Sequence, residues 1–229
     1  MMTFHVKPLR RVLMTALISV AAVSTGRADP DAQAILKNAR MAQTGQERTL
    51  EGHLRVESTG AIVPFTLVLA GDAIRYEFKD EAILLRLGEN GAQLMETRKG
   101  AAEKVSPARY DEPVEGTDIT YEDVSLKFLY WPVAKIDGSE TVDGLNCWKL
   151  HLAPGGETSA YAAVELWVSM RTGNFLEGEG YDATGKMVKR FKVISGQRDP
   201  LGGWMLKKMR IETLGKAEGE GITYLEIDK

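Results

Sequence analysis

The stretches Thr49-Leu-Glu-Gly-His-Leu-Arg-Val56, Phe65-Thr-Leu-Val-Leu69 and Ile74-Arg-Tyr-Glu-Phe78 decide the fold of this 229-residue chain. Their apolar side chains recur largely at every second position, which is the period of a β-strand with one buried face. Gly71 and Asp72 separate the last two stretches and are typical turn residues. The pattern therefore predicts a meander of antiparallel strands with a single apolar face.

Toward the C-terminus the same period continues on both sides of a middle region that lacks it. Asn90 and Gly91 indicate a hairpin turn, and Pro64 predicts that its position is an edge or a bulge. Residues 100–131 contain prolines and then an apolar patch from Val124 to Trp131, which predicts a loop that carries a short helical turn capped by Asp123. Further strands are predicted at Trp148–Leu152, Tyr161–Met170, Phe175–Tyr181, Met187–Ile194, Trp204–Leu214 and Ile222–Ile227.

On the N-terminal side of the first strand, the period changes to that of a helix. Asp29 is the expected N-cap and Pro30 the first helical residue, and the helix is expected to end at Gly45. One face of this helix is apolar, so we expect it to pack on the sheet. The apolar positions are Ala32, Ile35, Leu36, Ala39 and Ala42.

Residues 1–28 have the features of a secretory signal peptide. Lys7, Arg10 and Arg11 precede a run of about a dozen apolar residues, and Ala28 ends a short stretch of small residues suited to cleavage. The run is shorter than the roughly 20 residues that span a membrane, so no transmembrane anchor is expected in the mature chain. We therefore predict a leader at 1–28, a single domain at 29–229 and export to the periplasm.

Composition excludes several classes of partner. Without residues 1–28 the chain has 25 Lys and Arg against 32 Asp and Glu, a net charge of −7. This balance argues against nucleic-acid binding, which requires a basic surface. Cys147 is the only cysteine, so no intramolecular disulfide can form and the apolar core must hold the fold.

The sequence shows no convincing catalytic, cofactor or metal motif. The loop Gly180-Tyr-Asp-Ala-Thr-Gly-Lys186 has the glycine and lysine spacing of a phosphate loop, but Met187 stands where the hydroxyl is needed and the loop joins two strands. Cys147 and His151 lie about 13 Å apart if both are in one strand, so a nucleophile and base pair is not expected. The adjacent acids Glu122 and Asp123 are expected to point apart and to serve in capping or a turn. We therefore predict no enzymatic activity, no cofactor and no metal.

Four blocks of sequence resemble the outer membrane lipoprotein-sorting proteins of the LolA-like superfamily. They are Gly116-Thr-Asp-Ile-Thr-Tyr-Glu-Asp123, Gly144-Leu-Asn-Cys-Trp-Lys-Leu-His-Leu152, Val164-Glu-Leu-Trp-Val-Ser169 and Tyr181-Asp-Ala-Thr-Gly-Lys186. The resemblance implies an incomplete, strongly curved antiparallel β-barrel whose concave apolar face is covered by an N-terminal helix and a mid-chain helical lid. It also implies a carrier that binds the acyl chains of lipoproteins or lipids and delivers them toward the outer membrane. Its partners would be an inner-membrane transporter or exporter and an outer-membrane acceptor.

The chain departs from the well-known carriers of this superfamily at one step. Those carriers have an Arg-Pro pair, whose arginine helps to hold the lid, where this sequence has Gly71-Asp72. The cargo can therefore equally be another ligand with an acyl chain.

Alternation along the strands selects the residues expected to line the apolar concavity, and each of them could instead be ordinary core. The expected lining is Leu54, Val56, Phe65, Leu67, Tyr76, Phe78, Leu85, Trp148, Leu150, Leu166 and Phe191, and the expected lid is Ile35, Leu36, Leu126, Leu129 and Trp131. Two other functions stay open: an envelope sensor or accessory module of a lipid exporter built on the same fold, and a secreted hydrolase with polar residues in the cleft.

Overall fold

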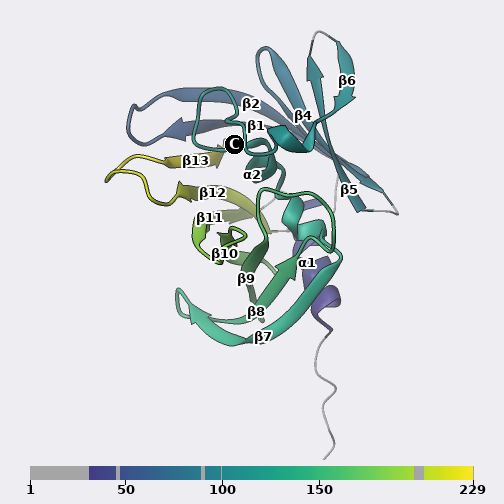
Figure 1. Cartoon of the computed structure of the whole chain (residues 1–229), viewed down its shortest axis with the longest axis vertical. Coiled ribbons are helices and arrows are strands. Elements are labelled where there is room, and N and C mark those ends of the chain that lie inside the picture. The colour runs from purple at the N-terminus through teal and green to yellow at the C-terminus, as the bar shows by residue number, and fades with distance from the viewer. Residues whose placement is uncertain (1–30, 45–46, 89–90, 99, 199–203, 229) are drawn as a thin grey trace, which may run out of the picture.

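The computed structural model describes residues 31–44, 47–88, 91–98, 100–198 and 204–228. These residues form one strongly curved, 13-stranded antiparallel sheet with two α-helices on its concave side (Figure 1). The predicted fold class is confirmed. The signal peptide, Asp29, Pro30, Asn90 and the turn predicted at 199–203 lie outside the described residues.

The sheet consists of two meanders joined at one strand pair. Within each meander, strands that follow one another in sequence are neighbours, and β1 pairs with β13 to join the two. The first meander contains β1 (Arg48–Val56), β2 (Ile62–Ala70), β3 (Ala73–Glu77), β4 (Glu81–Gly88), β5 (Gly91–Arg98) and β6 (Ala101–Lys104). The second contains β7 (Val133–Val142), β8 (Leu145–Ala153), β9 (Ala163–Ser169), β10 (Phe175–Tyr181), β11 (Met187–Arg198), β12 (Trp204–Thr213) and β13 (Ile222–Ile227).

This topology determines where the middle of the chain lies. β6 and β7 are consecutive in sequence but form the two opposite edges of the described sheet. Residues 105–132, which connect them, therefore cross the concave side, and we call them the mid-chain segment. It contains η1 (Pro107–Arg109), α2 (Tyr121–Ser125) and η2 (Lys127–Tyr130). With α1 (Ala32–Thr44) it forms what we call the cover of the concave face.

The starts of both helices differ from the sequence prediction, while the end expected for the first helix, Gly45, lies outside the described residues. α1 begins at Ala32, and the carboxylate of Asp31 accepts a hydrogen bond of 3.1 Å from the backbone N–H of Gln33, so Asp31 caps it where Asp29 was expected. α2 is capped by Thr120, and Asp123 completes a capping box as its third residue. Asp123 therefore caps the helix as expected, but as its third residue and not as the N-cap, because the sequence does not show at which residue the helix begins.

Most strand predictions are confirmed, including the strand-turn-strand geometry around Gly185. Pro64 lies in a regular pairing with His53 of β1, while the pairing of β2 with β3 begins only at Thr66. The strand is therefore locally an edge at Pro64, and the missing N–H costs no ladder bond.

A glycine permits close packing at the centre of the sheet. A Cβ atom on Gly52 would lie 2.5 Å from the carbonyl oxygen of Glu226 and 2.7 Å from the ring of Phe65. The absence of a side chain lets the Phe65 ring lie against the backbone of β1. That ring also packs edge-on against Tyr76 and Phe78, at centroid distances of 5.3 and 5.9 Å.

Candidate functional site

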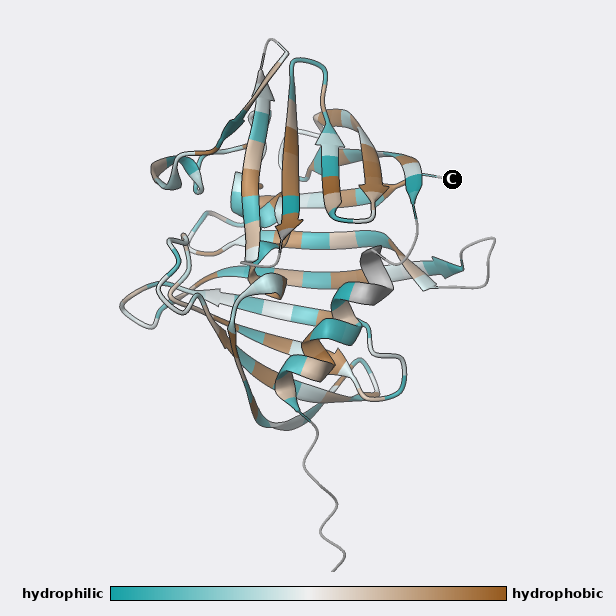
Figure 2. Ribbon diagram, turned by 90° about the vertical axis from the view of Figure 1, so that its right-hand side faces the viewer, coloured by the Kyte–Doolittle hydropathy of each residue, from teal (hydrophilic) through white to brown (hydrophobic). Residues whose placement is uncertain are grey.

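The candidate site is the apolar interface between the concave face and its cover. The alternation of apolar and polar residues along the strands is visible as brown and teal bands, and α1 lies across strands of the second meander (Figure 2). The predicted lining residues are buried except Trp148, which is half-buried and packs against the core. Those that belong to the common core cluster are Leu54, Phe65, Leu67, Tyr76, Phe78, Leu85, Leu150, Leu166 and Phe191. Val56 is buried outside this cluster, at the end of β1.

The predicted lid residues contact the same cluster from the other side. Ile35 and Leu36 of α1, and Leu126, Leu129 and Trp131 of the mid-chain segment, are all buried in it. Phe128, which is not one of the predicted lid residues, is fully buried with its ring 5.2 Å from the ring of Phe191. The structure thus brings the two predicted sets together, with the cover closed on the sheet.

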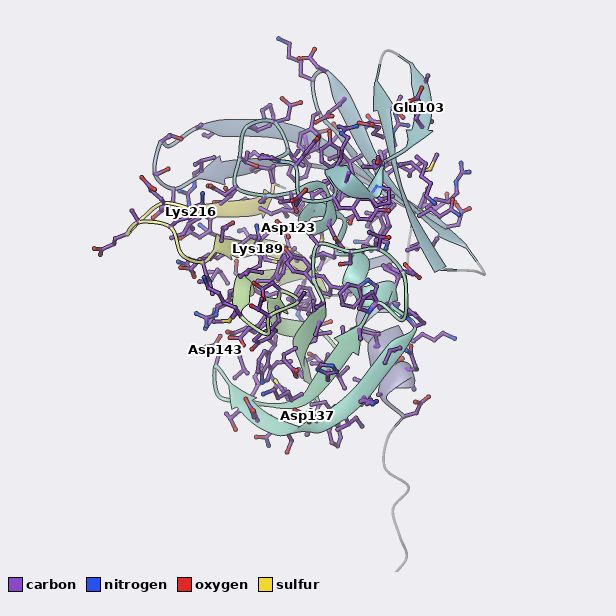
Figure 3. The ribbon with its side chains drawn as sticks, viewed as in Figure 1. Glu103, Asp123, Asp137, Asp143, Lys189 and Lys216 are labelled. Atoms are coloured by element: carbon purple, nitrogen blue, oxygen red, sulfur yellow. The ribbon has the colours of Figure 1, made fainter. Side chains whose placement is uncertain are left out.

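A buried ion pair fixes the mid-chain segment to the second meander. Lys189 Nζ of β11 lies 2.7 Å from Asp123 Oδ2, and the two side chains are 6% and 0% exposed. The hydroxyl of Tyr161 donates to the other carboxylate oxygen, and Lys189 also donates to Thr213 Oγ1 at 2.8 Å and to the carbonyl of Asp118 at 3.1 Å. Figure 3 shows Asp123 and Lys189 together at the centre of the molecule, whereas Asp137 and Asp143 lie at its periphery. Such a pair is costly to break because either partner alone would be an uncompensated buried charge.

The neighbouring carboxylate of Glu122 points to a different partner, as expected for adjacent residues. It accepts hydrogen bonds from Ser159 Oγ at 2.6 Å and from the backbone N–H of Ala160 at 2.7 Å. Burial raises the pKa of Glu122 above its ordinary value, and the two hydrogen bonds oppose this rise. The loop between β8 and β9 is thereby joined to α2.

The first meander is joined to the mid-chain segment by a second polar cluster. The hydroxyl of Tyr121 donates to Glu81 Oε2 of β4 at 2.6 Å. Arg109 forms ion pairs with Glu96 of β5 and with Glu112, and its guanidinium lies 5.3 Å from the centre of the Tyr121 ring. These carboxylates raise the pKa of Arg109. The mid-chain segment is therefore tied to both meanders through charged groups.

Side chains of α1 contact the rest of the cover through hydrogen bonds to main-chain carbonyls. Gln33 Nε2 donates to the carbonyl oxygens of Pro132 at 2.8 Å and Trp131 at 3.4 Å, and Arg40 Nε donates to the carbonyl of Leu129. α1 also packs apolar side chains against β7, β9, β12 and η2. These hydrogen bonds end on main-chain carbonyls, whereas α2 is held by the buried ion pair of Asp123 with Lys189.

Sequence reasoning missed the polar residues of the interface. Lys189 was passed over, although it stands two positions before the predicted lining residue Phe191 and so has the same orientation in β11. A lysine in phase with buried apolar residues is a usable signal of a buried ion pair. Arg40, which is not one of the apolar positions of α1, also turns its side chain toward Leu129 and Tyr130 of the cover.

The residues considered for metal binding or nucleophilic chemistry are not clustered in the described part of the chain. Groups of three or more His, Cys, Asp or Glu side chains able to hold a metal ion were not found among these residues. His151 Nδ1 lies 2.7 Å from Glu165 Oε1 in a cross-strand pair on the opposite face of the sheet from Leu150. Cys147 is buried, and burial raises the pKa of its thiol, as expected of a packing residue and not of a nucleophile.

Comparison with solved structures identifies the class of fold. An outer membrane lipoprotein-sorting protein domain from Vibrio parahaemolyticus has a TM-score of 0.69 and 17% identity, over 86% of this chain and 90% of its own. A LolA superfamily protein from Nitrosomonas europaea has a TM-score of 0.67 and 16% identity, over 87% and 92% of the two chains. A DUF1329 family protein from Desulfovibrio piger has a TM-score of 0.67 and 18% identity, over 86% and 91%. The fold is that of the LolA-like superfamily, as the sequence resemblance implied.

A family model extends this result at the level of sequence. This family model matches residues 99–229, which are more than half of the chain. The family is described as 'uncharacterized protein'-like. The chain therefore belongs to that family. No curated protein matches the sequence. Among the described residues, no helix has the length and apolar character needed to cross a membrane.

Proposed function

We propose that this protein is a periplasmic carrier that binds the acyl chains of lipoproteins or lipids against its concave face and delivers them toward the outer membrane. The observation that carries the proposal is the apolar interface between the sheet and a cover that includes one separable helix. The partners would be an inner-membrane transporter or exporter and an outer-membrane acceptor. The role is binding and release, without catalysis.

The energetics of an acyl chain suit an interface that opens and closes. Burying about 15 methylenes contributes roughly 12 kcal/mol, at about 0.8 kcal/mol each. Lost translational freedom and ordering take back several kcal/mol. In the closed form the concave face is covered by the protein's own side chains, such as Leu36 and Phe128. An entering chain replaces one set of apolar contacts with another, so the exchange is nearly balanced and the cargo can be released.

The contacts of the cover favour entry beneath α1. Removing α2 would separate Asp123 from Lys189 and Glu122 from its two donors. Removing α1 exposes its apolar face, which includes Ile35 and Leu36, and frees carbonyls of the mid-chain segment. We therefore assign α1 as the moving part of the lid and α2 as a fixed wall.

Binding of a fluorescent fatty acid to the purified mature protein tests the proposal. We expect saturable fluorescence enhancement that unlabelled palmitate reverses. Leu67→Gln should weaken binding about tenfold or more, because an amide placed against an acyl chain costs roughly 1–3 kcal/mol. Leu67 is a buried member of the core cluster.

The matched control is Val68→Gln on the opposite face of the same strand, where Val68 is half-buried. It should bind as the wild type does, and circular dichroism checks that both variants fold. Absence of saturable binding by the wild-type protein would contradict the proposal outright, whatever the variants do.

A further inference from the structure

Two hydrogen-bond donors in the cover are buried without a partner among the described residues. They are the hydroxyl of Tyr130, at the end of η2, and Nε1 of Trp131, the next residue. The Trp131 side chain is 1% exposed. A buried polar group without a partner is rare in native proteins and costs free energy, so it requires an explanation.

The surroundings of Tyr130 are both apolar and positively charged. The guanidinium carbon of Arg40 lies 5.1 Å from the centre of the Tyr130 ring, and Tyr130 packs against the core cluster that contains Tyr76. Burial raises the pKa of Tyr130 to about 12 and also raises that of Tyr76, with the two phenols close enough to influence each other. Burial lowers the pKa of Arg40 from its ordinary value. The phenol thus keeps its proton, and a cation stands beside it.

Tyr130 also lies at the boundary that the proposed entry route uses. Arg40 belongs to α1, and it donates to the carbonyl of Leu129, the residue before Tyr130. Tyr76 belongs to β3 and is one of the predicted lining residues. The unpartnered hydroxyl therefore sits where α1, the mid-chain segment and the concave face meet.

We propose that the Tyr130 hydroxyl, beside the positive charge of Arg40, binds the carboxylate of a long-chain fatty acid whose hydrocarbon tail lies on the concave face. This inference rests on the proposed function and deepens it by naming the polar end of the ligand. A carboxylate oxygen accepts a charge-assisted hydrogen bond, which is stronger than a bond to an ester carbonyl. Arg40 adds Coulomb attraction that the neutral ester does not feel.

The test compares palmitate with its methyl ester, since the two share a tail and differ at the head. Dissociation constants are measured by displacement of a fluorescent fatty acid from the full mature chain. The wild type should bind palmitate about tenfold more tightly than the ester, the ratio that a charge-assisted bond provides. Tyr130→Phe should reduce this ratio to less than about threefold. Tyr224→Phe is the matched control, because Tyr224 lies on β13 between Arg55 and Lys208, and it should preserve the ratio.

A second measurement distinguishes a ligand site from an internal structural bond. Without ligand, Tyr130→Phe should unfold at the same or a higher urea concentration, because it removes a buried hydroxyl that has no partner. A clearly lower midpoint would mean that the hydroxyl is satisfied within the protein, by a buried water molecule for example, and would overturn the inference. An equal affinity of the wild type for acid and ester would overturn it as well. If neither compound binds, the proposed function itself fails.

Discussion

Lys189 is the residue on which the closed form of the mid-chain segment most depends. Its ammonium group meets Asp123 in a site where both side chains are almost fully buried. We expect Lys189→Met to lower the free energy of unfolding by about 3–5 kcal/mol, because Asp123 keeps its charge but loses its cation. Urea unfolding at pH 7 measures this loss.

The same strand supplies the control. Lys192 pairs with Asp143 at 3.2 Å, but the two side chains are 34% and 59% exposed. Lys192→Met should therefore change the free energy of unfolding by less than about 1 kcal/mol. Equal effects of the two substitutions would show that the buried pair has no special role.

For individual residues, the sequence predicts well which apolar side chains are buried and poorly which polar side chains pair. Alternation placed Leu54, Leu150 and Phe191 correctly, because a period of two leaves only one choice of face. The pairing of Asp123 with Lys189 joins residues 66 positions apart, and no local rule indicates which acid meets which base. The hydrogen bond from Tyr161 to Asp123 is likewise apparent only when the structure places Tyr161 next to the mid-chain segment.

Among the elements, α2 carries the buried carboxylate of Glu122, whose titration should change the free energy of unfolding with pH. Burial raises the pKa of Glu122 above its ordinary value of 4.5, so the folded protein holds the proton more tightly than the unfolded chain does. This contribution to stability is complete below about pH 4.5 and is lost as the pH rises through the folded-state pKa. Relative to Glu122→Gln, the wild type should therefore become less stable as the pH increases.

Urea unfolding of both proteins between pH 4 and pH 8 checks this expectation. The informative quantity is the difference between the two unfolding free energies at each pH, since it cancels the titration of all other groups. A difference that stays constant over this interval would contradict a raised pKa for Glu122.

The elements differ in how far the sequence determines them. The strands were predicted because their alternating side chains face a core on one side and solvent on the other. For α2 the sequence predicts a short helical turn but not its bounds, because five residues are too few to define them. The helix forms because Thr120 and Asp123 cap it and the sheet buries it. The start of α1 was misplaced because Asp29 and Asp31 are both suitable caps and both lie next to Pro30.

At the scale of the whole molecule, the pairing of β1 with β13 accounts for the covered concave face. It places β6 and β7 at opposite edges, so the connection between them must cross the open side of the curved sheet (Figure 1). Strand patterns alone do not predict which strands of the two meanders pair. The LolA-like resemblance implied a curved sheet covered by helices but not this pairing. In the structure the mid-chain segment is joined to β4 and β5 on one side and to β11 on the other.

The two helices of the cover should open independently of each other. If α1 is the moving part, its amide protons should exchange through local opening, whereas those of α2 should exchange only when the protein unfolds globally. Gln33→Ala removes the hydrogen bonds to residues 131 and 132 and should speed exchange in α1 several-fold without affecting α2. Hydrogen exchange followed by mass spectrometry resolves the two segments. Lys37→Ala, a change at an exposed position of the same helix, is the control and should leave both rates unchanged. Exchange of α1 and α2 at one common rate in the wild type would mean that the cover moves as a single body, and entry beneath α1 would have to be abandoned.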